Sequence, residues 1–178
     1  MLTGFPVRFA LEAMNPHSNI YRALVINPGF AVYVDGPRVY ARNFEVPSGG
    51  GVCTARGIAR AYSVFATDGR DLGLRPETLC ALAAPAIPPT RGFHDECMRS
   101  DDIQFSLGFM KSSPEWRFGS VGSYGAPGAG GSIGFADPEA GVGYAYVTSQ
   151  MGTYLTGDPR DVALRDAIYS AITCARPT

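Results

Sequence analysis

One stretch near the C-terminal end constrains the fold of this chain more than any other: YGAPGAGGSIGFADPEAG, residues 124–141. Glycine and proline recur through it, and short β-type runs, 132–136 and 142–149, lie on either side of its last part, DPEAG. In that turn Pro138 fixes φ, Asp137 can accept bonds from the backbone that follows, and Gly141 can take a positive φ. The pattern predicts a β-hairpin.

Composition indicates a single packed domain. The chain has 178 residues, of which 46% are hydrophobic and 17% charged, so it can bury a core. The formal net charge is −1 and no basic block occurs, which argues against nucleic-acid binding. No apolar run is long enough to span a membrane, and no signal-peptide pattern is seen, so we expect a cytoplasmic protein.

The four cysteines do not have the paired spacing of a metal site. We therefore expect no metal and no cofactor. Buried free thiols are the favoured interpretation, and a disulfide between two of the cysteines is the alternative.

Three longer helices are predicted. One covers 54–66 with Thr54 as N-cap, and a second covers 76–84 with Pro76 in its first turn. The third covers 158–175 with Asp158 as its cap, and we expect it to lie across the face of the hairpin sheet. Its predicted apolar stripe consists of Leu164, Ile168, Ala171, Ile172 and Ala175.

The rest of the chain is less regular. Residues 103–110 alternate as one strand would. Short helices are expected after Pro6 and over 18–24, where Ser18 is the cap, but 1–52 as a whole reads as irregular and loop-rich. We therefore predict one domain, 1–178, with its sheet and helices in 53–178.

The glycine stretch matches two known motifs only in part. A phosphate-binding P-loop ends in Gly-Lys-Ser/Thr, but this stretch contains no lysine. A dinucleotide-binding loop needs glycine at its sixth place, where this chain has Ile133. Gly130–Gly134 does match the G-x-S-x-G of a nucleophile elbow, with Ser132 as nucleophile. However, the elbow precedes a helix and needs a later histidine, and the last histidine is His94. An enzyme that uses Ser132 stays a third possibility.

The stretch resembles a known active-site strand. Residues 124–141, followed by Val142–Met151, resemble the segment F-G-H-x-G-x-G-G-S-x-G-F-A-D-P-E-A-G and the strand after it in the serine β-lactamase-like superfamily, in particular its class C-related esterases. Pro47–Tyr62 resembles P-S-x-x-G-x-G-T-A-R-x-x-A-R-x-Y of the same family. The resemblance runs from about residue 15 onward.

This resemblance implies an α+β fold, part of a β-lactamase/transpeptidase-like lobe in which the C-terminal helix packs on an antiparallel sheet. It implies that the backbone N–H of Ala129 is an oxyanion donor and that the strand contacts substrate. The substrate-binding residues would be Tyr124, Ala126, Gly128, Gly130 and Ser132. The alternative is that the glycines serve only strand packing and turn geometry.

Two parts of the family pattern are missing. The family acylates a serine in S-x-x-K, but the only lysine is Lys111 and the residue three places before it is Gly108. Ala126 stands where relatives carry Lys or His, and Val52-Cys53 replaces a common His-Gly. We expect the C-terminal portion of an esterase-like hydrolase that acts on a small ester or amide and is inactive alone. Its open sheet edge would favour self-association or a complementary chain. A non-catalytic binding or regulatory module is the alternative.

Overall fold

The computed structural model describes residues 7–25, 53–96, 98 and 100–175. Its elements are α1 (Val7–Ala13), the π-helix η1 (Tyr21–Val25), α2 (Ala55–Ala66), the 3-10 helix η4 (Arg70–Leu72), α3 (Pro76–Ala83), β1 (Phe105–Ser106), β2 (Phe109–Lys111), β3 (Tyr124–Pro127), β4 (Ile133–Asp137), β5 (Val142–Tyr146) and α4 (Pro159–Ala175). The strands form one antiparallel sheet in the order β1-β2-β3-β4-β5, so the predicted α+β class is confirmed.

The predicted helix starts are confirmed. Thr54 Oγ1 accepts a bond from Gly57 N at 3.1 Å, Pro76 is the first residue of α3, and Asp158 Oδ1 accepts from Arg160 N at 3.0 Å. Thr54 and Asp158 each satisfy a backbone N–H that has no partner inside its helix, whereas α3 starts without a side-chain cap at Pro76, which has no N–H to satisfy.

The two short N-terminal helices are present as well, and Ser18 Oγ accepts from Tyr21 N at 3.0 Å. The loop-rich passage 26–52 lies outside the described residues, as does most of the Pro47–Tyr62 motif before α2.

The hairpin of β4 and β5 is confirmed. Asp137 Oδ1 accepts bonds from the N–H groups of Glu139 and Ala140 at 3.1 and 3.2 Å, and Gly141 has φ +69°. The carboxylate thus replaces backbone acceptors in the turn, and the glycine takes the left-handed conformation that closes it.

The prediction of one strand over 103–110 is wrong. The chain reverses at Leu107 and Gly108, whose φ values are +50° and +86°, so β1 and β2 form a tight hairpin with Phe105 opposite Met110. Positive φ at both central residues is the type I′ geometry that fits the twist of two-residue hairpins. The alternation of apolar residues continued through the turn and concealed it.

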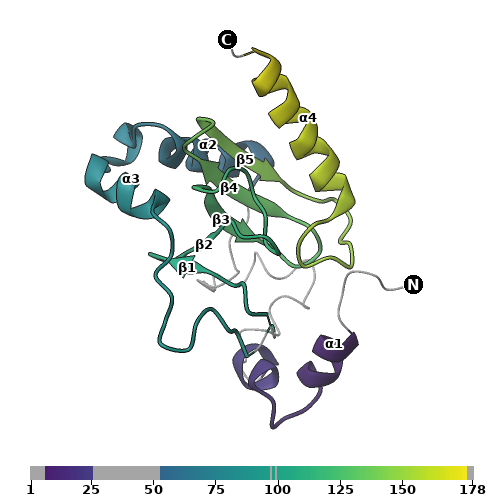
Figure 1. Cartoon of the computed structure of the whole chain (residues 1–178). Coiled ribbons are helices and arrows are strands. Elements are labelled where there is room, and N and C mark those ends of the chain that lie inside the picture. Colours follow the sequence, from purple (N-terminus) through teal and green to yellow (C-terminus); the bar gives the residue numbers. More distant parts are fainter. Residues whose placement is uncertain (1–6, 26–52, 97, 99, 176–178) are drawn as a thin grey trace.

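Helix α2 lies directly on one face of β4 and β5 (Figure 1). A Cβ at Gly143 would stand 2.2 Å from Ser63 N and 2.5 Å from Ala59 O, and one at Gly134 would stand 2.6 Å from a Tyr62 ring carbon. No side chain fits between the helix backbone and β5 at this point. The two glycines therefore set how closely the helix approaches the sheet.

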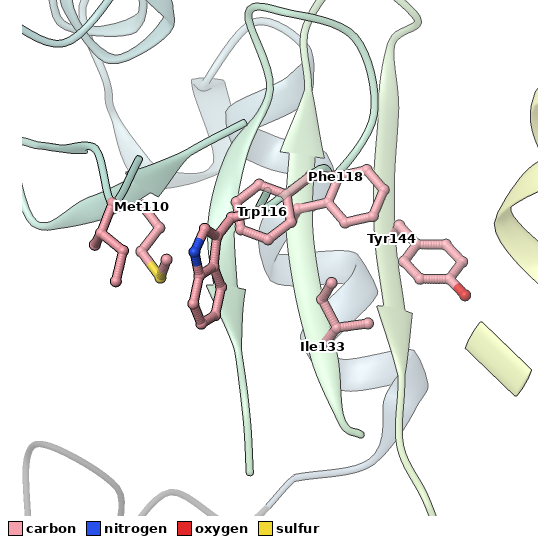
Figure 2. Close-up of a cluster of buried hydrophobic side chains, with 7 residues drawn as sticks. Met110, Trp116, Phe118, Ile133 and Tyr144 are labelled. Atoms are coloured by element: carbon pink, nitrogen blue, oxygen red, sulfur yellow. The ribbon is translucent and has the colours of Figure 1, made fainter. Parts of the chain in front are cut away.

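The opposite face of the sheet carries the larger apolar cluster. Figure 2 shows its labelled side chains spread across the strands, and the buried members are Ile103, Met110, Trp116, Phe118, Ile133, Phe135 and Tyr144. Because neighbouring residues of a strand point to opposite faces, Phe135 belongs to this cluster while Ala136 packs toward α2 and α3.

Helix α4 packs its Ile168 and Tyr169 against this cluster, but the predicted apolar stripe is wrong. Leu164, Ala171 and Ala175 are exposed, and the residues that α4 buries are Asp161 and Arg165. Arg165 Nε donates to Asp161 Oδ2 at 2.8 Å, and Tyr144 OH donates to Asp161 Oδ1 at 2.8 Å. A satisfied ion pair, rather than an apolar stripe, therefore docks the first half of α4.

We predict that Gly143→Ala destabilises the chain by about 2–3 kcal/mol, because the added methyl group meets helix backbone that cannot move aside locally. Urea unfolding followed by circular dichroism measures the change. The matched control is Gly57→Ala inside α2, where the nearest atom is the Sγ of Cys53 at 3.0 Å and alanine favours the helix. Equal stability of Gly143→Ala and the parent chain would contradict the packing described here.

We also predict that Arg165→Met costs about 3–5 kcal/mol, because it leaves the Asp161 carboxylate buried without its cation. The double variant Asp161→Leu/Arg165→Met removes both charges and should recover much of that loss. Thermal unfolding of the parent and both variants gives the comparison. A double variant that is less stable than Arg165→Met would show that the lost packing, and not the unpaired charge, dominates.

Candidate functional site

The turn that follows β3 is built from Gly128–Ser132. Gly128 N donates to Ser132 O at 2.6 Å, and Gly131 N donates to Gly128 O at 3.2 Å. Gly130 has φ +93°, which at the third place of a four-residue turn is the type II conformation and requires glycine. The sequence therefore makes β3 reverse sharply into β4.

The segment after β5 holds this turn in place. Gly130 N donates to Tyr154 O at 3.2 Å, and Gly152 N donates to Gly130 O at 2.7 Å. Added Cβ atoms would stand 2.8 Å from Met151 Cε at Gly130 and 2.4 Å from Asp158 Oδ2 at Gly131. These two glycines are explained by turn geometry and by this close contact.

Arg160 and Asp158 brace the same segment. Arg160 Nε and Nη2 donate to Asp158 at 2.9 and 2.6 Å, and Nη1 donates to Gln150 O at 3.1 Å. The bonds from Arg160 hold the pKa of the Asp158 carboxyl below its usual range, although burial acts in the opposite direction. The two-pronged ion pair with Asp158 orients the Arg160 guanidinium, and its remaining bond to Gln150 O links the start of α4 to the segment that contacts the turn.

Ala129 differs from its neighbours in this turn. Its peptide with Gly128 is trans and directs the Gly128 carbonyl toward Gly131, so the Ala129 N–H points the opposite way, out of the turn. Ala129 is exposed, and among the described residues its N–H has no acceptor. β2 pairs with β3 only at Tyr124 and Gly125, so none of the described strands covers this part of the edge.

A cavity of about 380 Å³ lies beside Ala129. Its described lining is almost entirely apolar: Ile20, Ala23, Asp95, Met98, Ile103, Phe105, Met110, Trp116, Pro127, Ala129 and Leu155. Ala129, whose N–H has no acceptor among the described residues, therefore borders an apolar space, and small-molecule sites combine such polar groups with apolar walls to orient a ligand.

The other predicted site residues divide into two groups. Gly128, Gly130 and Ser132 share the turn with Ala129, and the Ser132 hydroxyl accepts a bond from Thr148 N at 3.4 Å. Ala126 lies on β3, exposed, with its side chain on the α2 face of the sheet because it is paired with Gly134.

Tyr124 is fully buried among α2 and α3, where its hydroxyl donates to Phe65 O at 3.2 Å. Burial raises the pKa of this hydroxyl to about 12. The Tyr124 side chain is a core residue and does not reach the cavity.

The elbow interpretation of Ser132 is not supported. The chain runs from strand to turn to strand around this residue, whereas an elbow leads into a helix. Both histidines, His17 and His94, line another cavity, of about 610 Å³, whose described walls do not include Ser132. No imidazole is therefore placed to activate this hydroxyl.

Sequence reasoning missed the role of Lys111. Its Nζ donates to Leu82 O and lies 4.8 Å from the centre of the Tyr124 ring, with 2% of the residue exposed. Burial lowers the pKa of this ammonium group. Lys111 is paired with Tyr124, so its side chain lies on the face of the sheet that packs toward α2. Sequence analysis could have placed it there only if it had predicted the β1–β2 hairpin.

Within the described residues no group of His, Cys, Asp and Glu side chains has the arrangement of a metal site. Cys53, Cys80 and Cys174 are free thiols, but they are exposed rather than buried as predicted, and Cys97 lies outside the described residues. None of the helices described here is both long and apolar enough to cross a membrane.

Comparison with curated proteins finds the esterase/β-lactamase LipL of Mycobacterium tuberculosis (strain ATCC 25618 / H37Rv). It is 31% identical over 108 residues, which are 60% of this chain and 24% of LipL. The chain therefore spans about a quarter of that relative's length. No family model matches the chain.

Solved structures give a consistent result. A family VIII carboxylesterase superposes with a TM-score of 0.52 at 29% identity, covering 64% of this chain and 30% of the other. A penicillin-binding protein homologue from Caulobacter crescentus gives 0.56 at 34%, covering 66% of this chain and 32% of the other. The predicted resemblance is confirmed, although the matches cover less of the chain than its motifs suggested.

We predict that Gly131→Ala distorts the turn, because φ is +102° there and the added carbon would collide with the Asp158 carboxylate. The loss of stability should be about 1–3 kcal/mol, with the largest amide shift changes in a ¹⁵N spectrum at 128–132 and 150–160. Gly128→Ala, where the nearest atom is 3.3 Å away, is the control. Shift changes that spread equally over both variants would contradict this account of the turn.

Proposed function

The chain belongs, over the part that its relatives match, to the serine β-lactamase-like superfamily, and from this premise we propose that it is the oxyanion-side part of a β-lactamase-related esterase. In this proposal it supplies the wall against which an ester or amide carbonyl lies. It lacks the S-x-x-K nucleophile and is inactive alone.

The observation that carries the proposal is the outward-facing N–H of Ala129 beside an apolar cavity. When a nucleophile adds to an ester carbonyl, the carbonyl oxygen becomes an oxyanion. A fixed backbone N–H in a site that excludes water stabilises that charge without reorganising. The bonds of Gly130 to Tyr154 and Gly152 provide the rigidity that such a donor needs.

The attacking group must come from elsewhere in this proposal. The one lysine, Lys111, is buried against Tyr124 and hydrogen-bonded to Leu82 O, and it is not preceded by a serine at the required place. Removal of a nucleophile from a site of this kind abolishes nearly all of its rate acceleration.

The edge of β5 indicates where a second polypeptide segment could add. β5 is the last strand of the described sheet, and 142–149 contains neither a charged residue nor proline to block pairing. We propose that a complementary chain, or a second copy, pairs here. The cytoplasm stays our proposed location, on the sequence alone.

A second candidate function is a non-catalytic binding or regulatory module. The combination of an open apolar cavity with the missing S-x-x-K motif favours it. Such a module would bind an ester and release it unchanged, even with a complementary chain present, whereas the esterase proposal requires turnover once the nucleophile is supplied.

Covalent labelling tests the missing nucleophile. We expect the purified chain to hydrolyse p-nitrophenyl butyrate no faster than its Ser132→Ala variant, and to form no adduct with a fluorophosphonate serine probe when its intact mass is measured. An adduct on any hydroxyl of the chain would overturn the proposal, and its loss in Ser132→Ala would instead establish the Ser132 enzyme.

The oxyanion donor has a sharper test in Ala129→Pro. Proline is favoured at the second place of a type II turn, so the substitution deletes the N–H and keeps the fold. We expect 2-hexanone, an ester-like ketone that cannot be hydrolysed, to shift the Ala129 amide signal and to bind the variant about 2–10-fold more weakly. Ala129→Ser, which keeps the N–H, is the control. Unchanged affinity in Ala129→Pro would exclude this donor.

A further inference from the structure

The cavity beside Ala129 has a definite shape and position. Its described walls come from four separate parts of the chain: Ile20 and Ala23, the stretch from Asp95 to Trp116 that includes the β1–β2 hairpin, Pro127 and Ala129, and Leu155. At about 380 Å³ it falls in the range of natural ligand pockets. It lies on the face of the sheet opposite α2, because Met110 and Ile103 belong to the larger apolar cluster.

The cavity meets the candidate oxyanion donor directly. Pro127 of β3 and Ala129 of the turn, which both lie beyond the last β2 pairing at Gly125, stand in its wall. A carbonyl group bonded to the Ala129 N–H can therefore direct one of its two substituents into this space.

The charge of the lining limits what can enter. Asp95 is the one charged residue among the described lining residues, and its Oδ1 accepts a bond from Met98 N at 2.7 Å. A second carboxylate beside it would be repelled and would lose its water. The remaining walls offer hydrocarbon, the Met98 and Met110 thioethers and the Trp116 ring. Methionine and unbranched apolar walls accommodate flexible chains well.

We propose that this cavity is a chain-length-selective pocket for the uncharged hydrocarbon substituent of the bound carbonyl compound. Ile103, Met110, Trp116 and Leu155 line it, and Ala23 lines it from the N-terminal segment. The proposal deepens the esterase function above and rests on it for the position of the carbonyl group.

Trp116 makes the pocket directly observable. It is the only tryptophan of the chain, 8% of it is exposed, and it lines the cavity. Figure 2 shows its ring among the buried side chains of the larger apolar cluster. A ligand that enters the cavity changes the surroundings of this indole and therefore its fluorescence. Calorimetry gives a second signal, since burial of apolar surface on binding produces a negative heat-capacity change.

The experiment titrates the whole chain with methyl ketones from 2-butanone to 2-undecanone. We expect the dissociation constant to fall about fourfold for each added methylene and then to level off once the cavity is full. Alkanoates of matching length should bind more weakly than the ketones because of Asp95. Affinity that does not depend on chain length, measured by both fluorescence and calorimetry, would overturn the proposal.

A cavity-filling variant tests the location. Ala23 lines the cavity and is exposed, so Ala23→Phe adds a ring to the cavity wall without disturbing the core. We expect the dissociation constant to stop falling at a shorter ketone, and the longest ketones to bind at least tenfold more weakly. The matched control is Ala171→Phe, an exposed alanine of α4 outside the cavity lining. Equal behaviour of the two variants would place the binding elsewhere.

The outcomes separate this inference from the proposed function. A covalent adduct in the labelling experiment would end the half-site proposal and leave the chain-length series unaffected. Length-independent ketone binding would end the pocket proposal, while an Ala129→Pro effect on 2-hexanone would still support the oxyanion donor.

Discussion

The close contact between α2 and the β4–β5 hairpin is the constraint on which the rest of the structure depends. Gly143 and Gly134 carry no side chain, so the backbone of the helix at Ala59 and Ser63 lies against the strands. This contact fixes the plane of β4 and β5. β3 is then aligned by its pairing with β4, and the direction of the turn at the end of β3 follows.

The glycines around that turn have separate tasks. Gly130 and Gly131 have positive φ and lie against Met151 and Asp158, so their absence of a side chain is explained without any ligand. The donor that faces outward belongs to Ala129, which is not a glycine. The packing interpretation and the binding-wall interpretation of the sequence are thus compatible, because they concern different residues of one turn.

The apolar cavity and the outward donor meet at the edge that β2 leaves uncovered. The short β1–β2 hairpin matters here. Because the chain turns at Leu107 and Gly108, β2 begins only after that turn and pairs with β3 only at Tyr124 and Gly125. A longer β2 would cover Pro127 and Ala129 with backbone. The incorrect prediction of one strand over 103–110 therefore concealed the feature that opens the candidate site.

The sequence by itself determined the local structure, namely the starts of α2, α3 and α4 and the Asp137–Gly141 turn, because caps and turns depend on neighbouring residues. Its motifs also showed the resemblance to the superfamily. It did not determine which face of α4 is buried or where Tyr124 and Lys111 point. The directions of Tyr124 and Lys111 depend on pairing across the sheet, in which a shift of one residue exchanges the faces. The buried face of α4 depends on the distant groups that bond to Asp161 and Arg165. Only the tertiary structure brought Ala129 to the apolar cavity, since the walls come from segments far apart in the chain.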